Sequence, residues 1–310
     1  MFTGIISILA ATFCWGFIFV IPMYMTGFDP IEVTLGRFFS FGLISLVFLI
    51  LNKRYLLQRT YAKHWIKAFW YGFISSLVCY SGMVFCMRYT SPSVSALIYG
   101  ISPICIALLG NRQKREYRYR DFLLPAILTV IGITLTNLKA FETSNVSFPV
   151  YAFGFICGLI GLLAWAWYAV RNAKYQEENP GLPVLDWIVM LGVAIFCIVI
   201  TLAVPMAAFK PDLSHFVCKE FLIGSLILGS VCSWLPFFLW NLGTLRVPIS
   251  LAGQLTIFET IFGLILIYMI ETRLPSLFEF IGIVALFAGV LTAFKTLKKR
   301  GTKLFREELD

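Results

Sequence analysis

The chain has 310 residues, of which 59% are hydrophobic and only 13% are charged, and its formal net charge is +9. About one quarter of the residues of a water-soluble globular protein are charged, so this composition excludes a chain that covers its surface with polar groups and indicates a protein surrounded by lipid. A positive charge favours a nucleic-acid partner only where the basic residues form one face, and here they are divided among short loops.

Ten apolar segments follow one another, each close to the roughly 20 residues with which a helix crosses a bilayer. They lie at 3–22, 31–51, 65–87, 92–110, 121–138, 150–171, 185–208, 221–243, 247–270 and 277–297. The connections between them are too short to hold a soluble domain. Because the N-terminus lacks the basic region and the cleavage site of a signal peptide, we expect the first segment to remain as a membrane span.

The basic residues of the loops predict the orientation of these spans. With the N-terminus in the cytoplasm, the loops and tail on that side hold 19 Lys and Arg residues, the opposite side holds 5, and Arg37 lies inside a span. Cytoplasmic loops are enriched in Lys and Arg, so we expect a multi-pass protein of the cell inner membrane with both termini cytoplasmic. The basic stretch 112–120, which mixes cations with tyrosines, is expected to contact the anionic lipid surface and no nucleic acid.

The two halves of the chain echo each other weakly. Gly4 precedes Trp15 in the first span by the same offset as Gly154 precedes Trp165 in the sixth. Two stripes with equal offsets are Pro92, Ala96, Gly100, Pro103 and Ala107 in the fourth span, and Pro248, Ala252, Thr256, Glu259 and Gly263 in the ninth. Five spans per half turn the second copy upside down in the membrane, which is a recurring plan of secondary transporters.

We therefore expect an all-α integral membrane fold: ten transmembrane helices, arranged as two inverted five-helix repeats around a central cavity. The repeats are expected at 1–140 and 148–298, with a cytoplasmic tail at 299–310.

Five short motifs occur in order along the chain: "FCWGFIFVIP", "LGRFFSFG", "SALIYGISPICIALL", "LLAWAWYAVRNAKYQEENP" and "IGIVALFAGVLTAF". In this order the whole chain resembles the drug/metabolite transporter superfamily, in its ten-span EamA-type branch. The resemblance implies a carrier of small organic solutes with a cavity between its halves. Two positions depart from the superfamily pattern: Asn111 follows Gly110 where a glutamate is common, and Glu259 stands where a proline is common.

Glu259 lies near the middle of the ninth span, where an ionised side chain costs about 3 kcal/mol. Helical spacing places it on one face with Ala252, Thr256 and Gly263, so we expect it to point into the bundle and not into lipid. Three interpretations remain open. Glu259 pairs with Arg37 or Asn241 for packing alone, it carries a proton, or it is the counter-charge to a cationic part of the substrate.

Arg37 lies about two turns into the second span. It can attract a carboxylate or phosphate group, or hold Glu32 or helix carbonyls, and the superfamily pattern favours a structural or gating role, which we extend to Pro103. Four aromatic residues lie well inside spans: Trp15, Tyr99, Trp165 and Trp234. There an indole N–H or a phenol needs a polar partner or a cavity. The substrate-binding candidates are Glu259, Trp15, Tyr99, Trp165, Trp234, Asn241 and Gln254. Aromatic rings beside a carboxylate suit a cation with a flat ring.

A secondary transporter of a small organic metabolite is the function expected. The sequence offers an enzyme neither a metalloprotease nor a hydrolase motif, and no phosphate loop. No cofactor or metal is expected either, since the histidines, His64 and His215, fall in loops or at span ends, and the eight cysteines show no CxxC spacing and read as buried small hydrophobes. Besides a transporter and an enzyme, a third class of function stays open, that of a membrane assembly subunit that transports nothing.

The substrate stays open at this point. Superfamily relatives export amino acids or amphipathic drugs, and some similar carriers exchange S-adenosylmethionine with S-adenosylhomocysteine. The last would suit an acidic, aromatic cavity. The partners expected are therefore a small-molecule substrate, protons or a counter-substrate, and membrane lipid, while import or export and the oligomeric state stay open.

Overall fold

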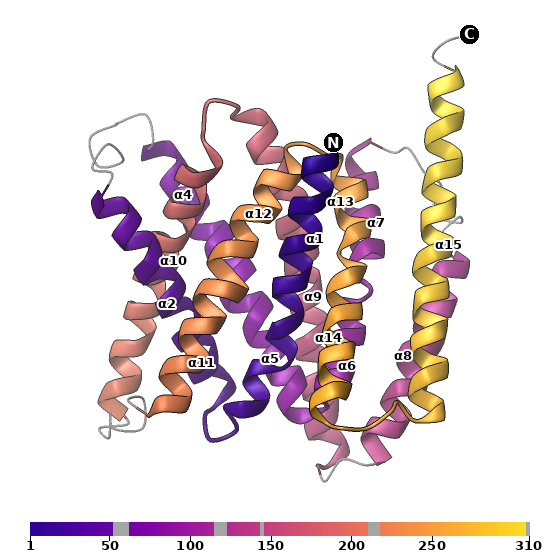
Figure 1. Cartoon of the computed structure of the whole chain (residues 1–310), viewed down its shortest axis with the longest axis horizontal. Helices are drawn as coiled ribbons and strands as arrows, with labels where there is room; N and C mark the ends of the chain where they lie inside the picture. The colour runs from indigo at the N-terminus through magenta and orange to yellow at the C-terminus, as the bar shows by residue number, and fades with distance from the viewer. Residues whose placement is uncertain (52–61, 115–122, 143–145, 210–217, 308–310) are drawn as a thin grey trace.

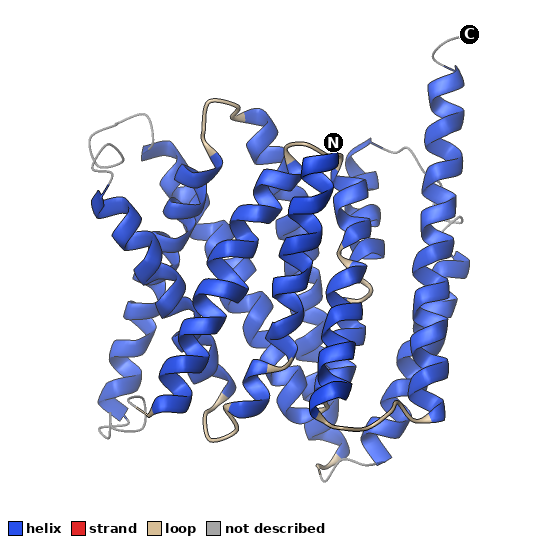
Figure 2. Cartoon of the chain, viewed as in Figure 1, coloured by secondary structure: helices blue, strands red, loops and turns tan. Residues whose placement is uncertain are grey.

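A computed structural model of the protein describes residues 1–51, 62–114, 123–142, 146–209 and 218–307. Every regular element in these ranges is helical, and no strand occurs in them (Figure 2). Eight helical segments are long and apolar enough to cross a membrane: Phe2–Tyr24, Pro30–Leu51, Ala62–Tyr89, Pro92–Gly110, Phe148–Glu178, Val184–Val204, Lys219–Thr244 and Leu251–Ile270. These correspond to eight of the ten predicted spans. The other two predictions fall on helices whose described apolar parts, Leu123–Leu135 and Leu277–Thr292, are shorter.

The helices follow one another along the chain and are interrupted by short 3₁₀-helical and π-helical turns. In the first half they are α1 (Phe2–Gly16), the short turns η1 (Phe17–Phe19) and η2 (Ile21–Tyr24), α2 (Pro30–Leu51), α4 (Ala62–Gly72), η4 (Phe73–Val78), α5 (Cys79–Tyr89), α6 (Pro92–Tyr99), α7 (Ser102–Lys114) and α8 (Leu123–Glu142). In the second half they are α9 (Phe148–Glu178), α10 (Val184–Phe209), α11 (Lys219–Gly229), η7 (Ser230–Trp234), α12 (Leu235–Thr244), α13 (Ile249–Leu255), α14 (Ile257–Ile270) and α15 (Leu277–Glu307).

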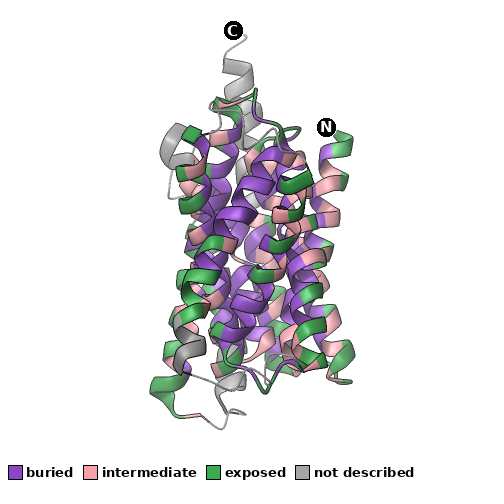
Figure 3. Cartoon of the chain, turned by 90° about the vertical axis from the view of Figure 1, so that its left-hand side faces the viewer, coloured by how far each residue is buried: buried purple, intermediate pink, exposed green. Residues whose placement is uncertain are grey.

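Neighbouring helices come from distant parts of the chain (Figure 1). In the centre, α1 packs against α12 and α14, and α9 packs against α5 and α7. On one flank α2 lies between α10 and α11, and on the other α8 pairs with α15. Buried residues gather between the helices and exposed residues lie on the outside (Figure 3), and many of the exposed ones are large and apolar, such as Phe39, Ile160 and Leu226. An apolar outer surface is the surface expected of a bundle that faces lipid.

Glycines allow the central helices α5 and α9 to approach closely. A methyl group built on Gly82 would lie 2.4 Å from the carbonyl oxygen of Cys157, and one on Gly161 would lie 2.6 Å from the carbonyl oxygen of Cys79. Small residues at a membrane helix interface permit this backbone approach. The glycines therefore fix the distance between the two helices.

We expect Gly82→Ala to destabilise the protein by about 2 kcal/mol, because the added methyl group overlaps a backbone atom that cannot move away alone. Thermal unfolding in detergent, followed by circular dichroism, measures the change. Gly27→Ala is the matched control, because no atom lies within 4 Å of a methyl group at that position, and its unfolding midpoint should match that of the parent chain. Equal midpoints for Gly82→Ala and the parent would contradict the packing described.

The fourth and ninth spans are each broken near the middle. The fourth begins where the Ser91 hydroxyl accepts from the amide of Val94 at 3.1 Å, and it divides into α6 and α7 after Tyr99. The ninth, predicted at 247–270, divides into α13 and α14 at Thr256. The broken segments cross in the interior: the Ser102 and Thr256 hydroxyls lie 2.9 Å apart, and the Thr260 hydroxyl donates to the carbonyl of Ala96 at 3.1 Å.

The third and eighth spans each contain a π-helical turn, η4 and η7. A π-helical turn shifts the hydrogen bonds of a helix by one residue and frequently occurs at functional sites. Both turns present short polar side chains to the interior: Ser75 and Ser76 in η4 and Ser233 in η7 are buried. The two turns thus place polar groups at the centre of otherwise apolar helices.

The turn between α14 and α15 is held by polar contacts. The Glu279 carboxylate accepts from the amide of Ser276 at 2.7 Å, and the Ser276 hydroxyl accepts from the amide of Glu279, which forms a capping box at the start of α15. Arg273 donates twice to Glu279, at 2.8 and 2.9 Å. These hydrogen bonds raise the pKa of Arg273.

The histidine and cysteine expectations have different outcomes. His64 lies at the end of a span as expected, in the first turn of α4, where it is buried and its Nδ1 lies within hydrogen-bond distance of the Tyr175 hydroxyl; His215 falls outside the described residues. All eight cysteines are free, but only Cys79, Cys86 and Cys232 are buried, and Cys197 is exposed on the outer surface. The buried-hydrophobe interpretation therefore fits three of the eight.

Candidate functional site

A small cavity lies at the centre of the bundle, where helices of both halves meet. Its wall includes Trp15 of α1, Arg37 of α2, Tyr99 of α6, Trp165 of α9 and Glu259 of α14. The cavity has a volume of about 30 Å³, which holds two or three water molecules at about 10–15 Å³ each. A metabolite needs a pocket of about 300 Å³ or more, so the conformation described here is closed around its centre.

Glu259 occupies the first turn of α14 and is only 6% exposed. The break at Thr256 gives this carboxylate a helix N-terminus in mid-membrane, where the helix dipole favours negative charge. Its side chain makes no hydrogen bond or ion pair with any residue that the structure describes. Asn241 does not pair with it, because the Asn241 amide donates to the carbonyl of Phe237 at 2.8 Å and accepts from Asn172 at 2.7 Å. Arg37 lines the same cavity, and its charge acts on Glu259 without a hydrogen bond between the two side chains.

Arg37 joins α2 to the π-helical turn η7. Its Nε donates to the Ser233 hydroxyl at 2.6 Å and its Nη2 donates to the Cys232 carbonyl at 2.7 Å. The guanidinium lies over the Tyr80 ring, 3.9 Å from the centroid, in a cation–π contact. Its Nη1 is buried and has no partner in the described part of the chain. One donor of an anchored arginine thus remains free beside the cavity.

Aromatic rings close the cavity on the side of the N-terminus. The Trp15 and Trp165 rings meet edge to face at 5.0 Å, and the Trp240 ring lies 5.7 Å from the first and 5.5 Å from the second. Phe237 and Tyr168 continue this wall, with ring centroids 5.8 Å apart. These five residues are named the aromatic wall below. Trp15, Trp165 and Phe237 line the cavity itself, and Trp240 and Tyr168 pack against the two tryptophans.

The structure brings together five of the residues singled out from the sequence: Trp15, Tyr99, Trp165, Glu259 and Arg37 line the same cavity. The remaining four lie elsewhere. Trp234 is half-buried and stacks on Phe48 at 5.0 Å, and Asn241 lies behind the aromatic wall, bonded to Asn172. Gln254 is half-buried on α13, and Pro103 is buried in the first turn of α7.

Several lining residues were missed from the sequence. Ser75, Cys79 and Met83 line the cavity because the π-helical turn η4 rotates this part of the span. The adjacent serines at 75 and 76 in an apolar span were a usable signal. Asn172 was missed because the sixth span was ended at residue 171, whereas α9 continues to Glu178.

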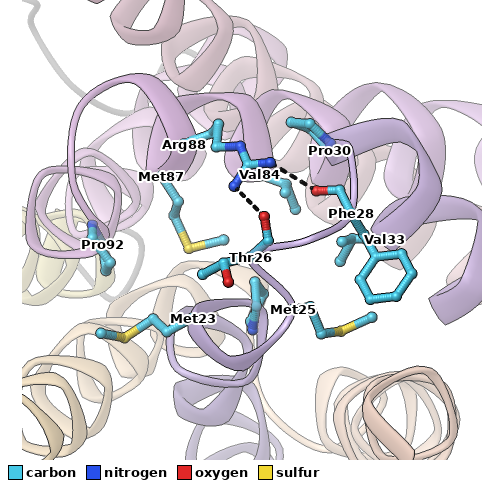
Figure 4. A pocket seen from close by; sticks show the side chains of 11 residues that line it. Met23, Met25, Thr26, Phe28, Pro30, Val33, Val84, Met87, Arg88 and Pro92 are labelled. Carbon is cyan, nitrogen blue, oxygen red and sulfur yellow. Dashed lines mark hydrogen bonds between the residues drawn. The ribbon is translucent and has the colours of Figure 1, made fainter. Parts of the chain in front are cut away.

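A wider vestibule opens on the side opposite the N-terminus, with a volume of about 310 Å³ (Figure 4). Three methionines, Met23, Met25 and Met87, line it, and flexible thioether side chains adapt to apolar groups of varied shape. Arg88 donates to the carbonyls of Thr26 and Phe28, both at 3.0 Å, and so ties the loop before α2 to α5.

The vestibule lies next to the central cavity along the bundle axis. Val33 and Val84 line the vestibule, and Arg37 and Tyr80, four residues away on the same helices, line the cavity. Four residues correspond to about one helical turn, or roughly 5–6 Å. A solute in the vestibule is therefore about one turn from the charged centre.

A bundle of apolar helices long enough to cross a membrane, with charged and aromatic residues at its centre, defines the class of multi-pass membrane proteins. Residues 2–138 of this chain match the sequence profile of the EamA-like transporter family. This confirms the family resemblance found in the sequence motifs.

Similar proteins extend the match to the second half. The inner membrane protein YtfF of Escherichia coli (strain K12) is 26% identical over 314 residues, covering 95% of this chain and 96% of the relative. The uncharacterized transporter YyaM of Bacillus subtilis (strain 168) is 22% identical, covering 67% of this chain and 66% of that protein. A solved crystal structure, 15% identical, aligns with a TM-score of 0.67 over 94% of this chain and 96% of its own, which shows a shared fold alone.

Proposed function

We propose that this protein is a secondary transporter that moves a small organic metabolite through the central cavity, across a bacterial inner membrane, with both termini in the cytoplasm. The observation that carries the proposal is the pair of charged residues in that cavity. Glu259 and Arg37 line one aromatic cavity, Nη1 of Arg37 is buried without a hydrogen bond to a described residue, and the carboxylate makes none either. Intramembrane ionisable groups that face a cavity mark substrate and ion pathways.

The pairing of helices supports two inverted five-helix repeats, at 1–140 and 148–298, followed by a tail at 299–310. The contact of α1 with α12 corresponds to that of α9 with α5, and the contact of α2 with α11 corresponds to that of α10 with α4. The spans of α8 and α15, which pair with each other, complete ten. The π-helical turns and the breaks also recur at corresponding places, since Gly100 and Thr256 follow Pro92 and Pro248 by the same offset.

The substrate that fits these groups has a positive group for Glu259, a flat or apolar body for the aromatic wall and, where present, an anionic group for Arg37. S-adenosylmethionine, exchanged for S-adenosylhomocysteine, meets this description, because its sulfonium can lie beside Glu259 while its adenine stacks on tryptophan. Amino acids and amphipathic drugs, exported from the cell, are the second candidates. In either case Glu259 binds the cation directly or exchanges it for a proton.

The other two classes of function are less well supported. The family, and the names of the relatives as an inner membrane protein and a transporter, favour a transporter over an enzyme. An assembly subunit has no need of an unpartnered carboxylate at its centre, since such a group destabilises the fold. A transporter accounts for both the carboxylate and the closed cavity around it.

An untargeted metabolite screen tests the proposal. Proteoliposomes that contain the full chain are loaded with a cell extract, and the solutes that leave or enter are compared with those of protein-free liposomes by mass spectrometry. Labelled S-adenosylmethionine is tested separately, with and without S-adenosylhomocysteine inside. We expect at least one cationic or zwitterionic solute to move only with the protein. If no solute distinguishes the two kinds of liposome, the transport proposal fails.

A further inference from the structure

The side of α9 that continues beyond the cavity carries a row of polar residues. Trp165, Tyr168, Asn172 and Gln176 follow one another at helical spacing and are all buried, with exposures from 0 to 6%. Residues three and four apart share one face of a helix. The row therefore runs from the central cavity, where Trp165 is part of the wall, towards the end of α9 on the side of the N-terminus (Figure 1).

A hydrogen-bonded cluster closes this row halfway. Asn172 Nδ2 donates to Asn241 Oδ1 of α12 at 2.7 Å, and Trp187 Nε1 of α10 donates to Asn172 Oδ1 at 2.8 Å. Asn172, Trp187 and Asn241 are fully buried. Asn172 thus joins three helices that come together directly behind the aromatic wall.

Polar atoms on both sides of this cluster have no partner. Both amide atoms of Gln176 are buried without a hydrogen bond to any described residue, as are the indole nitrogens of Trp165 and Trp240. The Tyr168 hydroxyl lies close to Asn241 without hydrogen-bond geometry. Buried polar atoms are normally satisfied, and each one left unpaired costs the free energy of its lost hydration. Packing alone does not explain why several unpaired polar atoms lie together in this region.

We infer that this buried polar face of α9 and α12 is the solute route between the central cavity and the N-terminal side, closed in this conformation by the hydrogen bond between Asn172 and Asn241. The atoms that lack partners here are the ones that water and solute reach when the route opens. The inference rests on the proposed transport function, and it assigns the second half of the route, opposite the methionine-lined vestibule.

The chemistry of this face suits a polar solute in transit. Its groups are neutral amides, indoles and a hydroxyl, which donate or accept hydrogen bonds but carry no charge that would hold an ion. A solute released by Glu259 and Arg37 meets no second charged group on these residues. The route therefore accepts cationic and zwitterionic solutes alike, and affinity is left to the central cavity.

Thiol labelling of the purified full-length chain tests the inference without any solute. Gln176→Cys reports whether the row is accessible, and the parent chain, with its eight native cysteines, gives the background rate of reaction with a polar maleimide. We expect Asn172→Leu to raise the labelling rate at position 176 about tenfold, because Asn241 loses its partner and is better accommodated in the open, wet conformation. A tenfold change corresponds to about 1.4 kcal/mol in the opening equilibrium.

Two comparisons separate opening of a route from loosening of the fold. Adding Asn241→Leu to Asn172→Leu removes the second polar group, so the apolar pair seals the row. The labelling rate at position 176 then returns to that of Gln176→Cys alone. Trp187 lacks its acceptor in both variants, so its loss does not distinguish them. Val189→Cys, fully buried on α10 in an apolar cluster, stays unreactive throughout.

The inference is overturned if Asn172→Leu leaves position 176 unreactive, if the double variant labels as fast as the single one, or if position 189 becomes equally reactive. Failure of the metabolite screen with the expected labelling pattern would instead remove the transport proposal and leave the gated polar row in place.

Discussion

Replacing Glu259 by Gln is expected to reduce transport of the solute found in the metabolite screen by about 100-fold. The loss of a contact to a charged group in a buried site is worth about 3 kcal/mol, and each 1.4 kcal/mol is about tenfold. The free energy of unfolding should stay the same or rise, because the substitution removes a buried charge that has no partner among the described residues. Initial rates in proteoliposomes and unfolding midpoints in detergent measure the two effects.

Glu177→Gln is the matched control, since Glu177 is exposed at the end of α9 and should tolerate the same change without loss of transport. The remaining activity of Glu259→Gln also separates two roles. If exchange persists but no longer depends on a proton gradient, Glu259 carries the proton; if affinity falls only for cationic solutes, it is the counter-charge. A variant that transports normally, or one that unfolds more readily, would return Glu259 to a purely structural role.

Arg37→Ala is expected to destabilise the protein by about 3 kcal/mol and to abolish transport. The change removes two hydrogen bonds from a charged donor, each worth about 1.5–3 kcal/mol, and the cation–π contact with Tyr80. It also leaves Glu259 as the one charged residue of the cavity wall. The same unfolding and transport measurements apply.

Two further variants divide the role of Arg37. Ser233→Ala removes the acceptor of Arg37 Nε and the hydroxyl's own hydrogen bond to the Leu228 carbonyl but keeps the charge, so we expect a loss of about 2 kcal/mol in stability with transport retained. Arg37→Lys keeps the charge but cannot reproduce the planar contact with Tyr80 or both hydrogen bonds, so it should lie between Ala and the parent in stability. An Arg37→Ala protein as stable as the parent would contradict the anchoring of α2 to η7.

Eight of the ten predicted spans are confirmed in the described residues, because length and hydrophobicity decide them locally. Pro30–Leu51, for example, begins and ends within one residue of the predicted 31–51. The break at Thr256 was not predictable in this way, since helical periodicity continues through it and the crossing of α13–α14 with α6–α7 depends on tertiary contacts. The same holds for the π-helical turns, which leave no pattern in hydrophobicity.

The site was predicted in part, because the sequence shows which polar residues lie in apolar segments but not always which way their side chains point. Glu259 and Arg37 stood out because ionised groups in apolar segments have few places to go except the interior. Trp234 also lay deep in a span, but the sequence does not say whether an indole faces the cavity or a neighbouring helix, and it stacks on Phe48. Asn172 lay outside the expected end of its span, so its contact with Asn241 could not be foreseen.

The two charged residues of the cavity also bear on how the membrane potential acts. Among the residues that line the cavity only Arg37 and Glu259 carry charge, so with both ionised the empty cavity is neutral. A potential of 100 mV exerts about 2.3 kcal/mol on each charge that crosses the full membrane. In the transport cycle proposed above, these two residues then add no net charge to the empty cavity, and we expect the voltage dependence of the transport current to report the charge of the solute and of any proton on Glu259.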